Sequence, residues 1–289
     1  MSSQSPYETP SQLLRGFEHR AKKRFGQHFL TDPRILDAIS TLAGVGAGDR
    51  VLEIGPGCGT LTLSLLQHGA SVQAVELDRD AIAFVREALE PYWPLTIVEG
   101  DVLRKDLSVL LAGEADDGSG GPWKVVANLP YNVATEIFFR LVEQRERIAV
   151  MVLMFQKEVA RRLVARVGDD GYGALSLMCR LHCDAEIVMN LPPGAFVPPP
   201  KVHSAVVRMV PLVKTRIEDE VQRRRFIKVV KGAFSTRRKT LPNALRTIGL
   251  DKDEVAAALE AMGLKTSARA EELGFEQFVA LSERVTLPV

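Results

Sequence analysis

Chemistry is concentrated in four consecutive residues, Asn128-Leu129-Pro130-Tyr131, which follow the apolar run Val125-Val126-Ala127. If this run is a buried strand, the Asn128 side-chain oxygen and the Leu129 carbonyl can both accept hydrogen bonds from an exocyclic amine. Pro130 removes a competing N–H and stiffens the turn, and the Tyr131 ring offers a stacking surface. The cluster predicts a site for methyl transfer to the amino nitrogen of a planar base, provided that the chain also binds a methyl donor. The plainer alternative is a strand that ends in a proline turn.

A glycine-rich turn, Glu53-Ile54-Gly55-Pro56-Gly57-Cys58-Gly59, lies between a predicted strand and a predicted helix. Glycines at Gly55 and Gly57 would let the backbone turn sharply and approach a ligand closely. The G-x-G-x-G spacing differs from the G-x-G-x-x-G of dinucleotide sites, which argues against a pyrophosphate. Glu76 ends the next predicted strand and could accept both hydroxyls of a ribose, and Asp101 ends the third and could receive an adenine amine. The sequence therefore predicts a nucleoside site.

Strands and helices alternate through the first two thirds of the chain, and this order would position both sites. The βαβα order predicts an α/β fold with a mostly parallel sheet covered on both faces. From about residue 216 onward the pattern is helical. We expect a poorly ordered N-terminal segment at 1–20, a sheet domain at 21–213 and a small helical domain at 214–289.

The formal net charge is only +1, but the basic residues are unevenly distributed. Residues 221–240 contain no acidic side chain, and a second basic cluster lies near the N-terminus. Such clusters can neutralise phosphates, although a solvated helix face is the plainer interpretation of either one alone. The two clusters comprise Arg223, Arg224, Arg225, Lys228, Lys231, Arg237, Arg238 and Lys239, and Arg15, Arg20, Lys22, Lys23 and Arg24.

The cysteines Cys58, Cys179 and Cys183 do not indicate a disulfide framework. Cys179 and Cys183 flank His182, but no second pair of ligands follows at metal spacing, so we predict packing in the core and no metal site. The N-terminal stretch has no apolar core of a signal peptide, and no run approaches the ~20 apolar residues of a membrane span. We expect a cytoplasmic protein with reduced thiols and no membrane contact.

Four segments match one family in order. They are Phe25-Gly26-Gln27-His28-Phe29-Leu30, the glycine turn, Asn128-Leu129-Pro130-Tyr131 and Phe196-x-Pro198-x-Pro200-Lys201-Val202. From about Lys22 to the C-terminus the chain resembles the rRNA adenine dimethyltransferases of the KsgA type. Within that family it looks like the bacterial enzymes that dimethylate two adjacent adenosines near the 3′ end of small-subunit rRNA. The resemblance implies a class I methyltransferase fold, with a Rossmann-like, mostly parallel seven-stranded sheet, followed by a small helical domain.

The same resemblance implies S-adenosyl-L-methionine as methyl donor and assigns roles by motif. The donor site would comprise His28, Leu30, Gly55, Gly57, Glu76, Asp101 and Asn128. The catalytic pocket would comprise Asn128, Leu129, Pro130, Tyr131 and Phe196, with the Tyr131 and Phe196 rings sandwiching a base drawn out of its stack. RNA contacts would come from Lys22, Lys23, Arg24, Arg223, Arg237, Arg238 and Lys239.

Three details leave alternatives open. His28 stands where many members of the family have Asn, Pro242 stands where a basic residue is common, and Phe196 could instead be a core or loop anchor. The implied partner is rRNA within the immature small ribosomal subunit, bound by a monomer. Competing functions are a resistance-type large-subunit rRNA adenine methyltransferase, a DNA adenine or protein glutamine methyltransferase, and an assembly factor that acts mainly by binding. Leu129 departs from the Asn-Pro-Pro-aromatic form of the DNA and protein enzymes.

Overall fold

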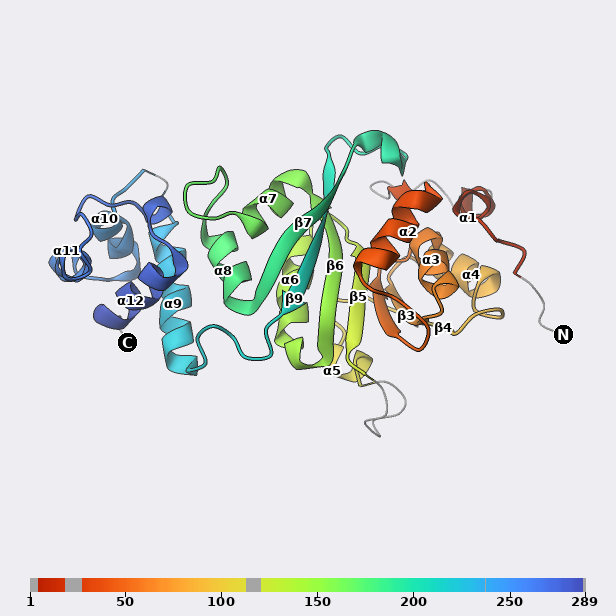
Figure 1. Ribbon diagram of the computed structural model, residues 1–289, viewed down its shortest axis with the longest axis horizontal. Coiled ribbons are helices and arrows are strands. Elements are labelled where there is room, and N and C mark those ends of the chain that lie inside the picture. Colours follow the sequence, from red (N-terminus) through yellow and green to blue (C-terminus); the bar gives the residue numbers. More distant parts are fainter. Residues whose placement is uncertain (1–4, 19–27, 113–120, 237, 288–289) are drawn as a thin grey trace. The chain divides into compact units, whose positions relative to one another are not determined.

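The computed structural model describes residues 5–18, 28–112, 121–236 and 238–287 (Figure 1). The predicted RNA contacts at Lys22, Lys23, Arg24 and Arg237 therefore lie outside the described residues. The chain forms two compact units, one of Met1–Ala160 with Glu186–Pro211 and one of Arg161–Ala185 with Leu212–Val289. In the described part, no helix is both long enough and apolar enough to cross a membrane.

A seven-stranded sheet in the order β4-β3-β2-β5-β6-β9-β7 organises the fold. Strands β4, β3, β2, β5 and β6 pair in parallel, and β9 pairs antiparallel to β6. The α/β class and the mostly parallel seven-stranded sheet are thus confirmed. The strands are β2 (Arg50–Ile54), β3 (Ser71–Glu76), β4 (Leu95–Glu99), β5 (Trp123–Asn128), β6 (Ile148–Gln156), β7 (Cys183–Leu191) and β9 (Ser204–Pro211).

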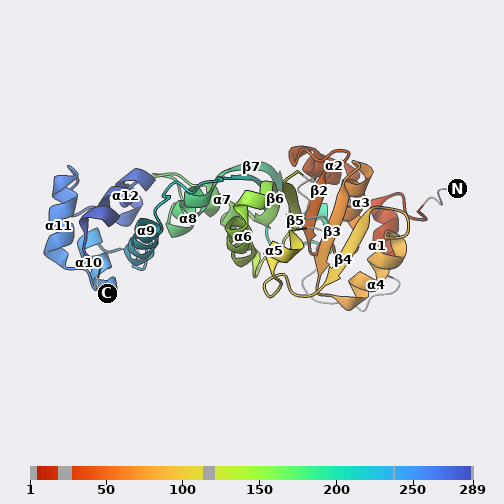
Figure 2. The ribbon, with the colours of Figure 1, turned by 90° about the horizontal axis from the view of Figure 1, so that it is seen from below.

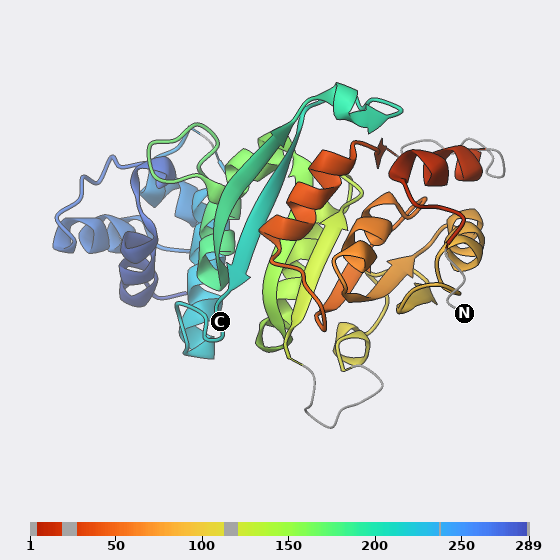
Figure 3. The same ribbon diagram turned by 45° about the vertical axis from the view of Figure 1, so that its right-hand side comes forward.

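Helices cover both faces of this sheet (Figure 3). Local sequence fixes where two of them begin: the side chains of Asp32 and Asp78 each accept a backbone N–H at the first turn of α2 and α4, and Pro33 opens α2 with a preset φ. The helices around the sheet are α1 (Pro10–Glu18), α2 (Pro33–Leu42), α3 (Thr60–Gln67), α4 (Arg79–Ala88), α5 (Leu107–Leu110), α6 (Ala134–Glu143) and α7 (Lys157–Val164).

Helix α1 corrects the expectation of a poorly ordered segment at 1–20. Its apolar residues Leu13, Leu14 and Phe17 are buried. The Phe17 ring meets Phe29 edge-on with centroids 5.7 Å apart, and it packs against Phe84 at 5.5 Å. The polar composition of this segment concealed a short apolar face, and burial of that face against the core stabilises the helix.

A two-stranded ribbon joins distant parts of the first unit. Strand β1 (Phe29–Leu30) pairs antiparallel with β8 (Phe196–Val197), so that Leu30 lies opposite Phe196. Short 3₁₀ turns at Arg145–Arg147 and Pro193–Ala195 complete this unit. Because β1 immediately follows His28, the ribbon determines where that side chain lies.

The second unit is helical, with α8 (Ala174–His182), α9 (Glu220–Ala233), α10 (Leu241–Leu245), α11 (Lys252–Ala261) and α12 (Phe275–Arg284), and with 3₁₀ turns at Arg246–Ile248 and Ala270–Glu272 (Figure 2). Its aromatic core includes Phe226 against Phe275, with centroids 5.0 Å apart. The expected boundary at 213/214 lies close to the observed one, but Arg161–Ala185 also belongs to this unit, which the sequence did not indicate. The Tyr172 hydroxyl ties this segment in by donating to the Leu273 carbonyl at 2.7 Å.

All three cysteines are free and buried, as their predicted packing role requires. The sulfur atoms of Cys179 and Cys183 lie 3.6 Å apart. Across the described ranges, no group of three or more His, Cys, Asp or Glu side chains is arranged to hold a metal ion.

Candidate active site

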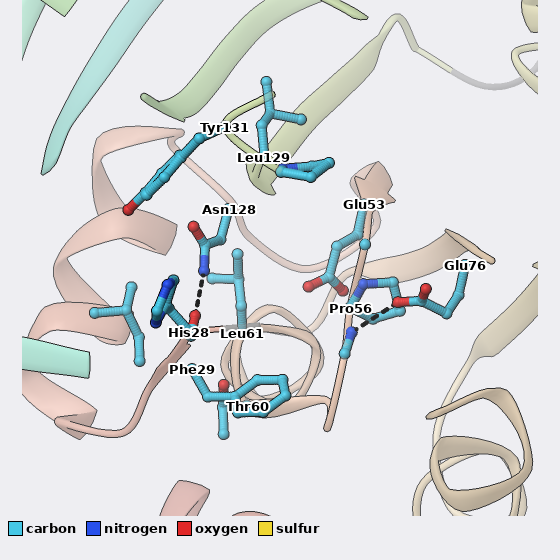
Figure 4. A pocket seen from close by; sticks show the side chains of 14 residues that line it. His28, Phe29, Glu53, Pro56, Thr60, Leu61, Glu76, Asn128, Leu129 and Tyr131 are labelled. Carbon is cyan, nitrogen blue, oxygen red and sulfur yellow. Dashed lines mark hydrogen bonds between the residues drawn. The ribbon is translucent and has the colours of Figure 1, made fainter. Parts of the chain in front are cut away.

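A pocket of about 800 Å³, counting its open mouth, lies at the carboxyl ends of β2, β3 and β5 (Figure 4). This edge is where open parallel sheets bind ligands. The pocket brings together most residues that the sequence singled out. Its lining is His28, Phe29, Leu30, Glu53, Gly55, Pro56, Gly57, Thr60, Leu61, Glu76, Asn128, Leu129, Pro130 and Tyr131.

Two glycines of the turn have different physical roles. Gly55 has φ +69°, and no atom lies within 4 Å of the position that a Cβ would occupy, so its surface is open for a ligand. Gly57 has φ +57°, and a Cβ there would lie 2.6 Å from the Phe29 ring. The first glycine therefore leaves space in the pocket, whereas the second permits close packing against β1.

Glu76 presents a fixed carboxylate at the end of β3. Its Oε2 accepts the Gly57 backbone N–H at 3.1 Å, and its Oε1 accepts those of Leu77 and Asp78 at 2.7 and 2.9 Å. Oε2 accepts a single bond from these backbone groups, so it can also accept a ligand hydroxyl. This geometry suits the predicted ribose-binding role.

Glu53 is a pocket residue to which the sequence analysis gave no role. Its side chain is 1% exposed, and its Oε2 has no hydrogen-bond partner in the described part of the chain. Burial raises the pKa of Glu53 to about 8; the Thr62 hydroxyl opposes this rise, and the Glu76 carboxylate adds to it. An acid inside the apolar run of β2, directly before the glycine turn, was the available signal.

Asn128 is oriented by a backbone group from a distant segment. Its Nδ2 donates to the His28 carbonyl at 2.9 Å, which leaves Oδ1 as the free acceptor (Figure 4). Nearby, the Tyr131 hydroxyl is hydrogen-bonded to Ser204 Oγ. Burial raises the pKa of the Tyr131 phenol, an effect that the Ser204 hydrogen bond partly offsets, so Tyr131 is a neutral aromatic surface. The pocket thus combines an amine acceptor with a ring.

The His28 side chain is also held in place. Its Nδ1 lies 2.7 Å from the Pro198 carbonyl, and since a carbonyl can only accept, Nδ1 carries the proton of this bond. The imidazole stacks with the Tyr131 ring, with centroids 6.4 Å apart and planes inclined by 24°. His28 therefore lines the base-facing side of the pocket as well as its entrance.

Two predicted site residues lie elsewhere. Phe196 is 2% exposed within the hydrophobic core and does not line the pocket, because its pairing with Leu30 turns the ring inward. The expected sandwich of Tyr131 and Phe196 is therefore not present in this conformation. Asp101 follows β4 as expected, but it also lies outside the pocket lining, and its carboxylate accepts the Leu103 N–H at 2.9 Å and pairs with Arg104 at 3.6 Å.

Predicted RNA contacts in the second unit separate into two groups. Arg223 is half-buried and donates to the Ile217 and Glu218 carbonyls, each at 3.2 Å, so it closes the start of α9 rather than presenting a free cation. Arg238 and Lys239 are exposed immediately before α10. These two side chains are accessible to a phosphate.

Comparison with known proteins gives consistent matches along the chain. The family model described as ribosomal RNA adenine dimethylase matches residues 18–287. The ribosomal RNA small subunit methyltransferase A of Magnetococcus marinus is 45% identical over 262 residues, which is 90% of each chain. A solved dimethyladenosine transferase from Plasmodium falciparum is 28% identical with a TM-score of 0.70, over 88% of this chain and 96% of that one. The 23S rRNA methyltransferase ErmE is 25% identical with a TM-score of 0.67, over 89% and 99%. The chain belongs to the ribosomal RNA adenine dimethylase family.

Proposed function

We propose that this protein transfers methyl groups from S-adenosylmethionine to the N6 atoms of two adjacent adenosines in the 3′-terminal hairpin of small-subunit rRNA, and so acts in biogenesis of the small ribosomal subunit. One observation carries this proposal: Asn128 is held with its Oδ1 free beside the Tyr131 ring, in a pocket that also presents a nucleoside-type acid, Glu76. The similarity to a small-subunit methyltransferase at 45% identity supports the choice of RNA.

The pocket fits the methyl donor in three respects. Gly55 leaves its surface open, Glu76 offers a carboxylate to ribose hydroxyls, and the buried Oε2 of Glu53 lacks a partner among the described groups, which a cationic group could provide. The bound donor supplies a methyl group made electrophilic by its sulfonium. Our proposed donor site therefore comprises His28, Leu30, Gly55, Gly57, Glu76 and Asn128, with Glu53 added.

The protein's contribution is orientation and electrostatics. The lone pair of an adenine amine is delocalised into the ring, so the nitrogen is a poor nucleophile. Asn128 Oδ1 and the Leu129 carbonyl would accept its two N–H bonds, aim the lone pair and favour a more pyramidal nitrogen. No strong base is needed, because the proton becomes acidic as the N–C bond forms. In the second transfer the monomethylated amine has one N–H fewer, so one acceptor must lose its donor.

The RNA would be held through phosphates at Arg238 and Lys239, and through the basic residues Lys22, Lys23, Arg24 and Arg237. Such contacts position the substrate but do not specify its sequence. We further propose that the protein acts as a monomer, in the cytoplasm, on an immature small subunit.

Methyl transfer from radiolabelled donor to three substrates tests this function: immature small subunits, large subunits and naked rRNA, each followed by nucleoside analysis. Dimethyladenosine formed on small subunits alone is the expected result. Label on large-subunit RNA would favour an activity like that in the name of the ErmE structure. Binding of donor and subunit without any transfer would favour an assembly factor.

A further inference from the structure

The ring that faces Tyr131 across the pocket is the imidazole of His28. Their planes are inclined by only 24°, and both residues line the pocket. Figure 4 shows the Asn128 side chain between the two rings in that view. A flat ligand between these rings would therefore have its edge directed toward the free Asn128 Oδ1.

The spacing of the two rings matches such a ligand. Stacked bases repeat about every 3.4 Å, so a base with a ring on each face needs centroids about 6.8 Å apart. The observed separation is 6.4 Å, which a slight opening of the pair would bring to that value. Phe196, by contrast, is enclosed in the core at 2% exposure and would have to leave it to reach a base.

Hydrogen bonds hold each member of this arrangement before any base arrives. His28 Nδ1 binds the Pro198 carbonyl at 2.7 Å, Asn128 Nδ2 binds the His28 carbonyl at 2.9 Å, and the Tyr131 hydroxyl binds Ser204. Rings and acceptor are therefore preorganised, which lowers the cost of ordering them on binding.

We propose that the target adenine is held between the His28 imidazole and the Tyr131 ring, with its amine at Asn128 Oδ1, while Phe196 remains a core residue. This inference rests on the proposed function. It gives His28 a role in binding the base that is separate from any role in binding the donor. Adenine is the base whose exocyclic amine donates to an acceptor such as Oδ1, so the stack and the acceptor select the same ligand.

The test compares His28→Ala, His28→Phe, His28→Asn and Phe196→Leu with the wild-type chain, and uses His68→Ala as a histidine control outside the pocket. Initial rates of methyl transfer to immature small subunits give kcat/KM for the RNA, and calorimetry gives the affinity for S-adenosylmethionine. Thermal unfolding verifies that each variant is folded. Loss of one stacking face predicts a decrease of roughly 5- to 160-fold in kcat/KM for His28→Ala, with donor affinity within about threefold.

The aromatic replacement provides the decisive comparison. His28→Phe keeps a ring but loses the Nδ1 bond to Pro198, so it should restore most of the activity that His28→Ala loses, whereas His28→Asn should not. Restoration by Asn alone, or a loss of donor affinity in His28→Ala, would overturn the proposal in favour of a polar or donor-binding role.

Phe196→Leu retains an apolar core residue, and we expect it to reduce transfer less than His28→Ala does. The opposite order would identify Phe196 as the stacking ring and overturn the inference while leaving the proposed function intact. A wild-type chain that forms no dimethyladenosine on small subunits would overturn both.

Discussion

Asn128 Nδ2 donates a hydrogen bond to the His28 backbone carbonyl, so two residues 100 positions apart in the chain determine which amide atom faces the pocket. An amide side chain can present either a donor or an acceptor. The carbonyl removes this ambiguity, because it can bind only the NH₂ end. The acceptor that an adenine amine requires is therefore a property of two segments together.

Replacing Asn128 by Ala should lower methyl transfer by on the order of 100-fold, because it removes a preorganised polar group at the reacting amine. Binding to small subunits should remain close to wild type, as measured by filter retention at fixed salt. Asn128→Asp is the matched variant: it keeps an acceptor, but a carboxylate cannot donate to His28, and it should also be inactive. Full activity of Asn128→Asp would show that the bond to His28 is dispensable.

The two glycines of the turn should respond differently to alanine. Gly57→Ala places a Cβ 2.6 Å from the Phe29 ring as well as forcing a left-handed φ, so unfolding free energy should fall by about 2–4 kcal/mol. Gly55→Ala has only the backbone cost of about 1–2 kcal/mol, but its methyl group enters the pocket and should weaken donor binding. Urea unfolding and calorimetry measure the two effects, and equal destabilisation would contradict the proposed division of roles.

Glu53 should make stability depend on pH. Burial raises its pKa from 4.5 to about 8 in the folded protein, so between these values the folded state holds a proton that the unfolded chain has lost. Its contribution is complete below pH 4.5 and is lost as the pH rises toward 8. Glu53→Gln stays neutral throughout and should become more stable than wild type by a few kcal/mol at pH 8 relative to pH 5.

Urea denaturation at pH 5 and pH 8 checks this, with exposed Glu143→Gln as the control. A wild-type protein and a Glu53→Gln variant with the same dependence on pH would show that Glu53 is not buried as the fold describes.

Charge reversal at Arg238 and Lys239 should weaken binding to small subunits without changing donor affinity. The slope of log K against log salt concentration should decrease by about 2, one for each lost phosphate contact. Arg223→Ala should instead lower the unfolding free energy by about 1–3 kcal/mol, because its guanidinium satisfies backbone carbonyls. Unchanged subunit affinity across a salt series for the double variant would contradict an RNA contact there.

The sequence was sufficient for features that depend on local pattern. The strand at 50–54, the helix capped by Asp32 and the alternation that produces a parallel sheet follow from periodicity and capping residues within a few positions of each other. The position of Glu76 and Asn128 at one sheet edge follows in turn, because parallel strands end on the same side.

Features that depend on distant partners were not predictable in this way. Phe196 reads equally well as a stacking ring or a core anchor until its pairing with Leu30 shows that the ring faces inward. Asp101 lies two positions beyond the strand end, where its carboxylate binds the local turn. The membership of Arg161–Ala185 in the helical unit depends on contacts such as that of Tyr172 with Leu273, a hundred positions away.

The ribbon of β1 and β8 also has a consequence for how the protein is made. A chain that grows from its N-terminus at roughly 5–20 residues per second exposes His28 roughly 10–30 seconds before Pro198, its hydrogen-bond partner 170 residues later. Until then, the imidazole and the strand beside it lack the backbone that holds them. The methyl-acceptor side of the pocket is therefore completed only late in synthesis, after most of the sheet has emerged, and a nascent chain stalled before residue 196 should be catalytically silent.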